Sequence, residues 1–108
     1  MLGHRVIVAL LLRDGFLIKT TRFKKEDYLG DPINAIRIYN EMEVDELVFL
    51  DIYATRRHQP IRFDLLRTVA DECFMPMGYG GGITSLDEMR EIFGIGFEKV
   101  VINSAALK

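Results

Sequence analysis

Four short, mainly apolar runs recur along this chain of 108 residues, and an amphipathic stretch follows each of the first three. The runs occupy residues 6–12, 44–52, 75–78 and 99–103. Runs rich in Val, Ile and Leu that alternate with amphipathic stretches predict strands alternating with helices, which is typical of a parallel α/β sheet with right-handed crossovers. The first run is apolar throughout, and this favours a strand covered on both faces.

The stretches after the first two runs carry helix and loop signals. Asp31 and Pro32 are suited to the N-cap and first-turn positions of a helix that reaches about Met42. A second helix is expected from about residue 60 to residue 73. Residues 19–30 are polar and basic, so we expect a mobile loop there.

The third helix has the clearest start signal in the chain. Ser85 and Glu88 have the spacing of a capping box, and Gly94 or Gly96 is expected to end the helix. Helical spacing places three apolar residues on its buried side, namely Met89, Ile92 and Phe93.

An internal repeat points to the architecture. Residues 46–51 align with residues 99–104 at an offset of 53 (99 minus 46), and each segment ends in a polar group where its strand meets a loop. Four strand–helix units related in this way predict a (βα)₄ half of a (β/α)₈ barrel, which needs on the order of 200 residues. We therefore expect residues 1–108 to be one half-barrel unit, a fragment of a chain about twice as long. Its open sheet edges are expected to pair with another copy or to aggregate.

The composition excludes several classes of function. A net charge of -2 gives no electrostatic footprint for nucleic acid or an acidic membrane surface. The single Cys73 cannot form an internal disulfide, so the cytoplasm is the expected compartment. No Cys/His pair has zinc-ligand spacing, and we expect neither a metal nor a cofactor. The apolar run at residues 6–12 is too short to cross a bilayer.

Three charged residues stand at the N-terminal ends of predicted strands. Period-two alternation puts Arg5, Glu46 and Lys99 in phase with apolar positions that would face a barrel interior. Charges of both signs at one barrel mouth could form a ring of ion pairs. Ordinary solvated charge at strand ends is the alternative, and the residues alone leave both open.

A second group of polar and small residues falls at the C-terminal strand ends, where barrel active sites are built. Glycine-rich turns before helix starts bind phosphate through backbone N–H groups, although the same glycines can serve only a tight turn. Lys19 could close over such an anion or be simply solvated, and Asp51 could be an acid/base or a structural strand-end cap. The anion sites expected here, which suit a phosphorylated small molecule, comprise Gly81, Gly82, Asn103 and Ser104.

Taken together, these residues resemble the cyclase subunit of imidazole glycerol phosphate synthase. The likeness covers the whole chain and rests on Met1-Leu2 with Arg5, Asp14-Gly15, Lys19, Gly30-Asp31-Pro32, residues 45–52, Gly80-Gly81-Gly82-Ile83, Lys99-Val100 and residues 102–106. It implies a full (β/α)₈ barrel, of which this chain would be the N-terminal (βα)₄ half. In that family the barrel joins ammonia to a phosphorylated ribulosyl-formimino-carboxamide ribonucleotide in histidine synthesis, a lyase and cyclase reaction. A glutaminase subunit would dock on the N-terminal face and feed ammonia through the barrel.

The resemblance also assigns roles to residues. Arg5, Glu46 and Lys99 match three of the four charged residues that gate the ammonia channel, which favours the ring of ion pairs. Lys19 matches the lysine of the active-site loop. One phosphate site is matched by Gly82, Asn103 and Ser104, and the second phosphate site and second catalytic carboxylate would belong to the other half of the barrel.

One departure from the family pattern concerns the first strand. The family has Cys-Leu-Asp where this chain has Ala9-Leu10-Leu11, and leucine cannot transfer a proton. Loss of a general acid or base typically lowers a rate by about 10²–10⁴-fold. The Leu11 variant resembles a paralogous branch linked to glutamine-dependent amidation of sugars in surface-polysaccharide synthesis. Three functions are thus expected as alternatives: a cyclase subunit, a non-cyclising ammonia conduit, or an inactive self-associating half-barrel.

Overall fold

A computed structural model describes residues 5–13, 16–21, 25–30, 32–51 and 60–102 of the chain. In chain order the elements are β1 (Ile7–Arg13), β2 (Phe16–Thr21), β3 (Lys25–Gly30), α1 (Pro32–Glu41), β4 (Glu46–Leu50), α3 (Phe63–Glu72), β5 (Met77–Gly80), α4 (Leu86–Ile95) and β6 (Lys99–Val101). The predicted strands and the three predicted helices are confirmed, with boundaries that differ by a few residues. The helix that a fourth strand–helix unit requires after Ser104 would lie outside the described residues.

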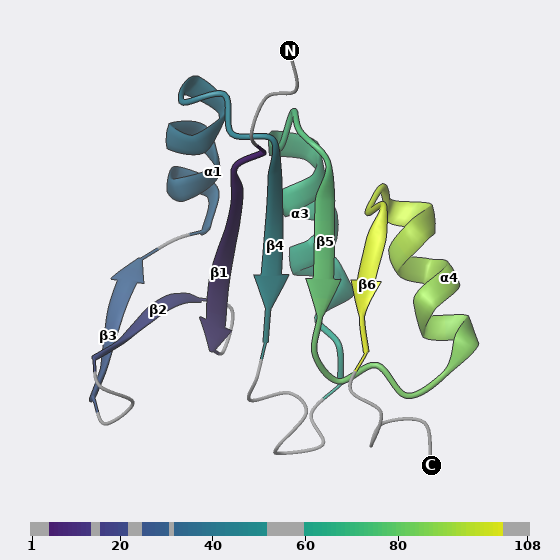
Figure 1. Ribbon diagram of the computed structural model, residues 1–108. Coiled ribbons are helices and arrows are strands. Elements are labelled where there is room, and N and C mark those ends of the chain that lie inside the picture. The colour runs from purple at the N-terminus through teal and green to yellow at the C-terminus, as the bar shows by residue number, and fades with distance from the viewer. Residues whose placement is uncertain (1–4, 14–15, 22–24, 31, 52–59, 103–108) are drawn as a thin grey trace.

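The described strands form one sheet in the order β3-β2-β1-β4-β5-β6 (Figure 1). β1, β4, β5 and β6 are parallel neighbours, as expected for the (βα)₄ half of a (β/α)₈ barrel. Their N-terminal ends meet at the top of Figure 1 and their C-terminal ends at the bottom. The prediction of an α/β half-barrel is therefore confirmed.

The expected loop at residues 19–30 is wrong. β2 and β3 pair antiparallel with each other over most of this segment, and β2 also pairs antiparallel with β1, where Leu11 lies opposite Ile18. Ile18 is 3% exposed, so the segment is anchored to the sheet by an apolar side chain. Charged residues are tolerated on an edge strand such as β3, and for this reason composition did not reveal the antiparallel pair that it forms with β2.

One face of the sheet carries the hydrophobic core. Side chains that alternate along the parallel strands point towards the helices, as Leu47 and Phe49 of β4 do, both 0% exposed. The helices contribute their apolar stripes, and α3 lies behind β4 and β5 in Figure 1. The buried residues include Leu10, Leu12, Ile36, Leu66, Val69, Met77, Tyr79, Ile92 and Phe97. We call this the outer face, because helices lie outside the strands in a barrel.

The opposite face of the sheet, here called the inner face, is open. Ile7 of β1 and Val101 of β6 are 53% and 50% exposed. The expectation that β1 is covered on both faces is therefore wrong for the described residues. A long apolar run shows that a strand lies in a parallel sheet, but it does not show whether the same chain supplies both covering layers.

Helix α4 begins with the predicted capping box. The Ser85 hydroxyl accepts a hydrogen bond from the Glu88 N–H at 3.2 Å, and Glu88 Oε1 accepts from the Ser85 N–H at 3.1 Å. Glu88 Oε1 also accepts from the Thr84 N–H at 2.7 Å. Partial burial opposes ionisation of Glu88, but hydrogen bonds from Thr84 and Ser85 outweigh it, and the pKa of the carboxyl lies below its ordinary value.

The end of α4 settles one open choice and corrects one prediction. Gly96, with a φ of 129°, is the C-cap, whereas Gly94 lies within the helix. Phe93 was expected on the buried side, yet it is 45% exposed, and Ile92 beside it is 0% exposed. The sheet is narrow at β6, its edge strand, and the apolar stripe of α4 is wider than the surface it can cover.

Candidate functional site

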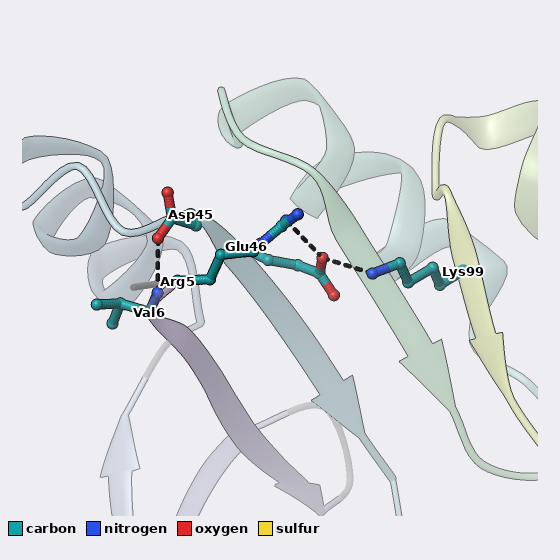
Figure 2. A network of polar contacts seen from close by, with 5 residues as sticks. All are labelled: Arg5, Val6, Asp45, Glu46 and Lys99. Carbon is teal, nitrogen blue, oxygen red and sulfur yellow. Dashed lines mark hydrogen bonds and ion pairs between the residues drawn. The ribbon is translucent and has the colours of Figure 1, made fainter. Parts of the chain in front are cut away.

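A buried carboxylate lies at the N-terminal end of the inner face. Glu46 is the first residue of β4 and its side chain is 4% exposed. Lys99 Nζ donates a hydrogen bond to Glu46 Oε1 at 2.8 Å, and Arg5 Nη2 lies 3.5 Å from the same oxygen (Figure 2). The three charges therefore form a connected cluster, and the alternative of separately solvated strand ends does not hold.

The two cations of this cluster remain in contact with water. The side chains of Arg5 and Lys99 are 63% and 58% exposed. A carboxylate removed from water needs partners that hold its charge, whereas exposed cations keep much of their hydration. Glu46 is consequently the member that depends most on the other two. The internal repeat at an offset of 53 places Glu46 and Lys99 at equivalent ends of the second and fourth strand–helix units, and their side chains meet across the strand between them.

Asp45 holds the start of β1 in place, and sequence analysis gave it no role. Its Oδ2 accepts a hydrogen bond from the Val6 N–H at 2.6 Å, and its own N–H donates to the Val6 carbonyl at 3.0 Å. This pair of bonds ties the residue after Arg5 to the residue before Glu46. The sequence signal for this role was an aspartate directly before Glu46, a charged residue predicted to face inward.

From this cluster towards the C-terminal ends of the strands, the inner face is apolar. The next layer runs from Ala9 through Val48 to Gly78 in register. The layer after it runs across all four parallel strands through Leu11, Leu50, Gly80 and Val101. Leu11 thus lies opposite Leu50 in an apolar layer.

The glycine turn follows directly on β5 at the C-terminal edge. Gly81 and Gly82 have φ values of 133° and 69°, a region that side-chain-bearing residues rarely adopt. A Cβ on Gly81 would overlap the Asp51 carbonyl oxygen and lie 3.0 Å from the Asp51 carbonyl carbon. The turn is therefore built from glycine both for its conformation and for its close approach to Asp51.

Asp51 is buried beside this turn. It is 7% exposed, and its N–H donates to the Gly80 carbonyl at 2.8 Å. The pKa of the neighbouring Tyr79 hydroxyl lies well above its ordinary range. Burial is the largest cause, and the negative charges of Asp51 and Glu88 add to it. Asp51 thus lies buried at the C-terminal edge of the sheet, against the glycine turn.

Three further predicted site residues are placed only in part. Lys19 lies on β2, paired with Asp27 of β3, and not in a loop. Asn103 and Ser104 lie outside the described residues. Val101, two residues before Asn103, pairs with Gly80, so β6 ends beside the glycine turn.

The described residues hold no group of three or more His, Cys, Asp or Glu side chains that could bind a metal ion. None of their helices is long and apolar enough to cross a membrane.

Parallel strand–helix units with an ion-pair cluster at one end and a glycine turn at the other define this chain as half of a TIM-barrel protein. Residues 5–108 match the family described as "Histidine biosynthesis protein". The chain belongs to this family, which confirms the resemblance found in the sequence.

Curated relatives agree with this assignment. The chain is 57% identical over 107 residues to "Putative imidazole glycerol phosphate synthase subunit hisF2" of Pseudomonas aeruginosa. This match covers 99% of this chain and 43% of that protein. It is 44% identical over 108 residues to "Putative imidazole glycerol phosphate synthase subunit HisF" of Leptospira interrogans, covering 100% of this chain and 42% of the relative. It is 43% identical over 107 residues to "Imidazole glycerol phosphate synthase subunit HisF" of Streptococcus mutans. This match covers 99% of this chain and 43% of that protein. The chain spans less than half the length of these relatives.

Proposed function

We propose that the chain is the N-terminal half-barrel of a cyclase-type subunit that uses ammonia from a glutaminase in imidazole glycerol phosphate synthesis. The observation that carries this proposal is the buried Glu46 held by Lys99 and Arg5 at the N-terminal end of the inner face. Family membership and the names of the relatives support it. The partner would be a glutaminase on the N-terminal face, and the reaction would take place in the cytoplasm.

The cluster would act as the gate for ammonia. Its 2.8 Å contact between Lys99 and Glu46 crosses the inner face, so a molecule entering from the N-terminal side meets this ion pair first. Beyond the pair, the apolar layers that contain Val48 and Leu50 disfavour a charged species, because desolvation of an ion is costly. Neutral ammonia would therefore pass, and ammonium would be retained at the gate.

The C-terminal rim would hold the phosphorylated substrate. The backbone of Gly81 and Gly82, with Asn103 and Ser104, would bind one phosphate through N–H groups, as glycine-rich turns do. Lys19 would contact the substrate from β2. Asp51, buried at the rim, would serve as the acid/base or bind a hydroxyl of the substrate.

Leu11 favours a second function. It lies opposite Leu50 in the apolar layer below the rim, where the family carries an aspartate. With no titratable group at this position, the barrel would conduct ammonia without cyclising the ribonucleotide, and the ammonia would serve amidation of a sugar in surface-polysaccharide synthesis. We place this second to the cyclase function.

The test uses the complete protein assembled with its glutaminase. A cyclase converts the ribonucleotide with glutamine as nitrogen source, and Leu11→Asp then changes the rate little. A non-cyclising conduit converts it about 10²–10⁴-fold more slowly, and Leu11→Asp restores part of the rate. Lys99→Glu uncouples glutamine hydrolysis from product formation under either function. Coupling that survives Lys99→Glu would contradict the gate.

We also propose that residues 1–108 form one unit that self-associates when separated from the rest of a barrel. The exposed Ile7 and Val101 on the inner face give it an apolar surface to cover. Sedimentation velocity is expected to show dimers or larger species. A stable, compact monomer would contradict this proposal.

A further inference from the structure

The inner face of β5 carries no side chain beyond a hydrogen atom. Inward positions on this strand are Gly78 and Gly80, in register with Val48 and Leu50 of β4 on one side. Lys99 and Val101 of β6 are their partners on the other side. A bare strip of backbone therefore lies between two strands that do present side chains.

Backbone conformation does not explain Gly78. Its φ is not positive, in contrast to Gly81 and Gly82. A glycine inside a strand weakens it and often marks a place where another group approaches closely. For Gly80 that group is in the sheet itself, since a Cβ there would lie 2.9 Å from the Val101 Cβ and 3.1 Å from the Leu50 Cδ2.

The side chain of Lys99 begins beside Gly78, because a Cβ on Gly78 would lie 3.6 Å from the Lys99 Cβ. Lys99 lies opposite Gly78 on β6, and Glu46 lies on β4, on the far side of β5. To bring Nζ within 2.8 Å of Glu46 Oε1, the lysine side chain must cross β5 from one edge to the other. Figure 2 shows Lys99 reaching from its strand across β5 towards Glu46.

Two side chains flank the Cβ position of Gly78. A Cβ on Gly78 would lie 3.6 Å from the Lys99 Cβ and 3.5 Å from the Val48 Cγ2, which is ordinary contact. One methyl group therefore fits. A longer side chain would extend into the space between Val48 and Lys99, where the lysine side chain begins its path towards Glu46.

We infer that Gly78 is a positioning residue for the gate: its missing side chain lets Lys99 cross β5 and close on Glu46. The inference rests on the proposed passage of ammonia past this pair, and it adds a residue that acts through Lys99 without touching ammonia or substrate. The size of the side chain at position 78 then sets how well glutamine hydrolysis is coupled to product formation.

The experiment compares Gly78→Ala and Gly78→Leu in the complete protein with its glutaminase. The measured quantity is the ratio of product formed with ammonium chloride to product formed with glutamine. Gly78→Leu is expected to raise this ratio about tenfold, and Gly78→Ala by less than about twofold, because residues in one network couple at this scale. Gly78→Met takes the place of Gly78→Leu if the leucine variant does not fold.

A double variant separates positioning from general crowding. If Gly78 acts through the lysine, Gly78→Leu adds nothing to the ratio once Lys99→Met is present. Additive effects of the two changes, or equal ratios for Gly78→Ala and Gly78→Leu, would overturn the inference.

Failure of the proposed function gives a different result. In that case the unmodified protein forms no product from either nitrogen source. A crystal structure of Gly78→Leu then still decides the positioning role, which predicts that Lys99 Nζ no longer lies within hydrogen-bond distance of Glu46. An intact contact would overturn it.

Discussion

The two faces of the same sheet differ in what covers them. On the outer face, Leu47 and Phe49 are 0% exposed under the helices, and on the inner face, Ile7 and Val101 are about half exposed. In the ion-pair cluster of the inner face, Glu46 has the deeply buried side chain, and the cations of Arg5 and Lys99 contact it. The comparison teaches that stability of the described chain comes from the outer face, while the inner face carries the groups proposed for function.

The strongest test of this comparison replaces two neighbouring residues of β4, one at a time, by alanine. Phe49→Ala is expected to lower the free energy of unfolding by about 3–5 kcal/mol, because it removes a ring packed 6.4 Å from Phe97 and leaves a cavity. Val48→Ala, one residue away on the inner face, is expected to cost about 1 kcal/mol, since Val48 is only partly buried. Urea denaturation followed by circular dichroism measures both. Equal costs would break the distinction between the faces.

At the C-terminal rim the prediction concerns backbone. Gly81→Ala is expected to destabilise the protein by about 2–4 kcal/mol, because it combines a positive φ with overlap against Asp51. Gly94→Ala is the matched control: nothing lies within 4 Å of its Cβ position and it is helical, so a gain of about 0.5–1 kcal/mol is expected. The same urea titration compares the two. A Gly81→Ala variant as stable as the control would mean that the turn can shift away from Asp51.

At the N-terminal end the prediction is an asymmetry within the ion-pair cluster. Lys99→Met is expected to cost about 1–3 kcal/mol, because it leaves the buried Glu46 with only its longer contact to Arg5. Glu46→Gln is expected to cost less than about 1 kcal/mol, since the two cations left behind face water. The double variant should resemble Glu46→Gln. If Glu46→Gln were the more damaging change, the description of Glu46 as the dependent member would be wrong.

The smallest expected effect lies in the capping box on the outer side of the sheet. The pKa of Glu88 is lower in the folded than in the unfolded protein. The contribution of this carboxylate to stability is therefore present above its unfolded-state pKa and is lost as the pH falls through its folded-state pKa. Glu88→Ala is expected to cost about 1 kcal/mol at pH 7 and less in acid. Thermal unfolding of both proteins between pH 7 and pH 3 measures the difference. A gap that widened in acid would contradict the sign.

Local signals predicted much of this fold. The Ser85–Glu88 capping box and the helix after Asp31-Pro32 depend on contacts within a few residues, and both are confirmed. Signals that depend on distant neighbours were less reliable. The β2–β3 pair was missed because its charged residues are acceptable at a sheet edge, and Phe93 was misplaced because helical spacing does not show how wide a surface the sheet offers.

The site shows the same division. Alternation along the strands indicated that Arg5, Glu46 and Lys99 share the inner face, since side chains alternate with period two in any strand. The alternation could not show that Glu46 is buried, that Asp45 holds the start of β1, or that Lys99 reaches Glu46 across β5. Those relations depend on which strands are neighbours.

By itself, then, the sequence determined the order of the four parallel strands and the three helices, the glycine turn and the phase of the charged residues, because these follow from short-range geometry and residue chemistry. Only the tertiary structure decided which face is open, how the inner charges pair and why β5 has glycine at position 78. The reason is that a strand's register and its lateral neighbours are set by hydrogen bonds and packing between segments far apart in the chain, such as the 53 residues that separate Glu46 from Lys99.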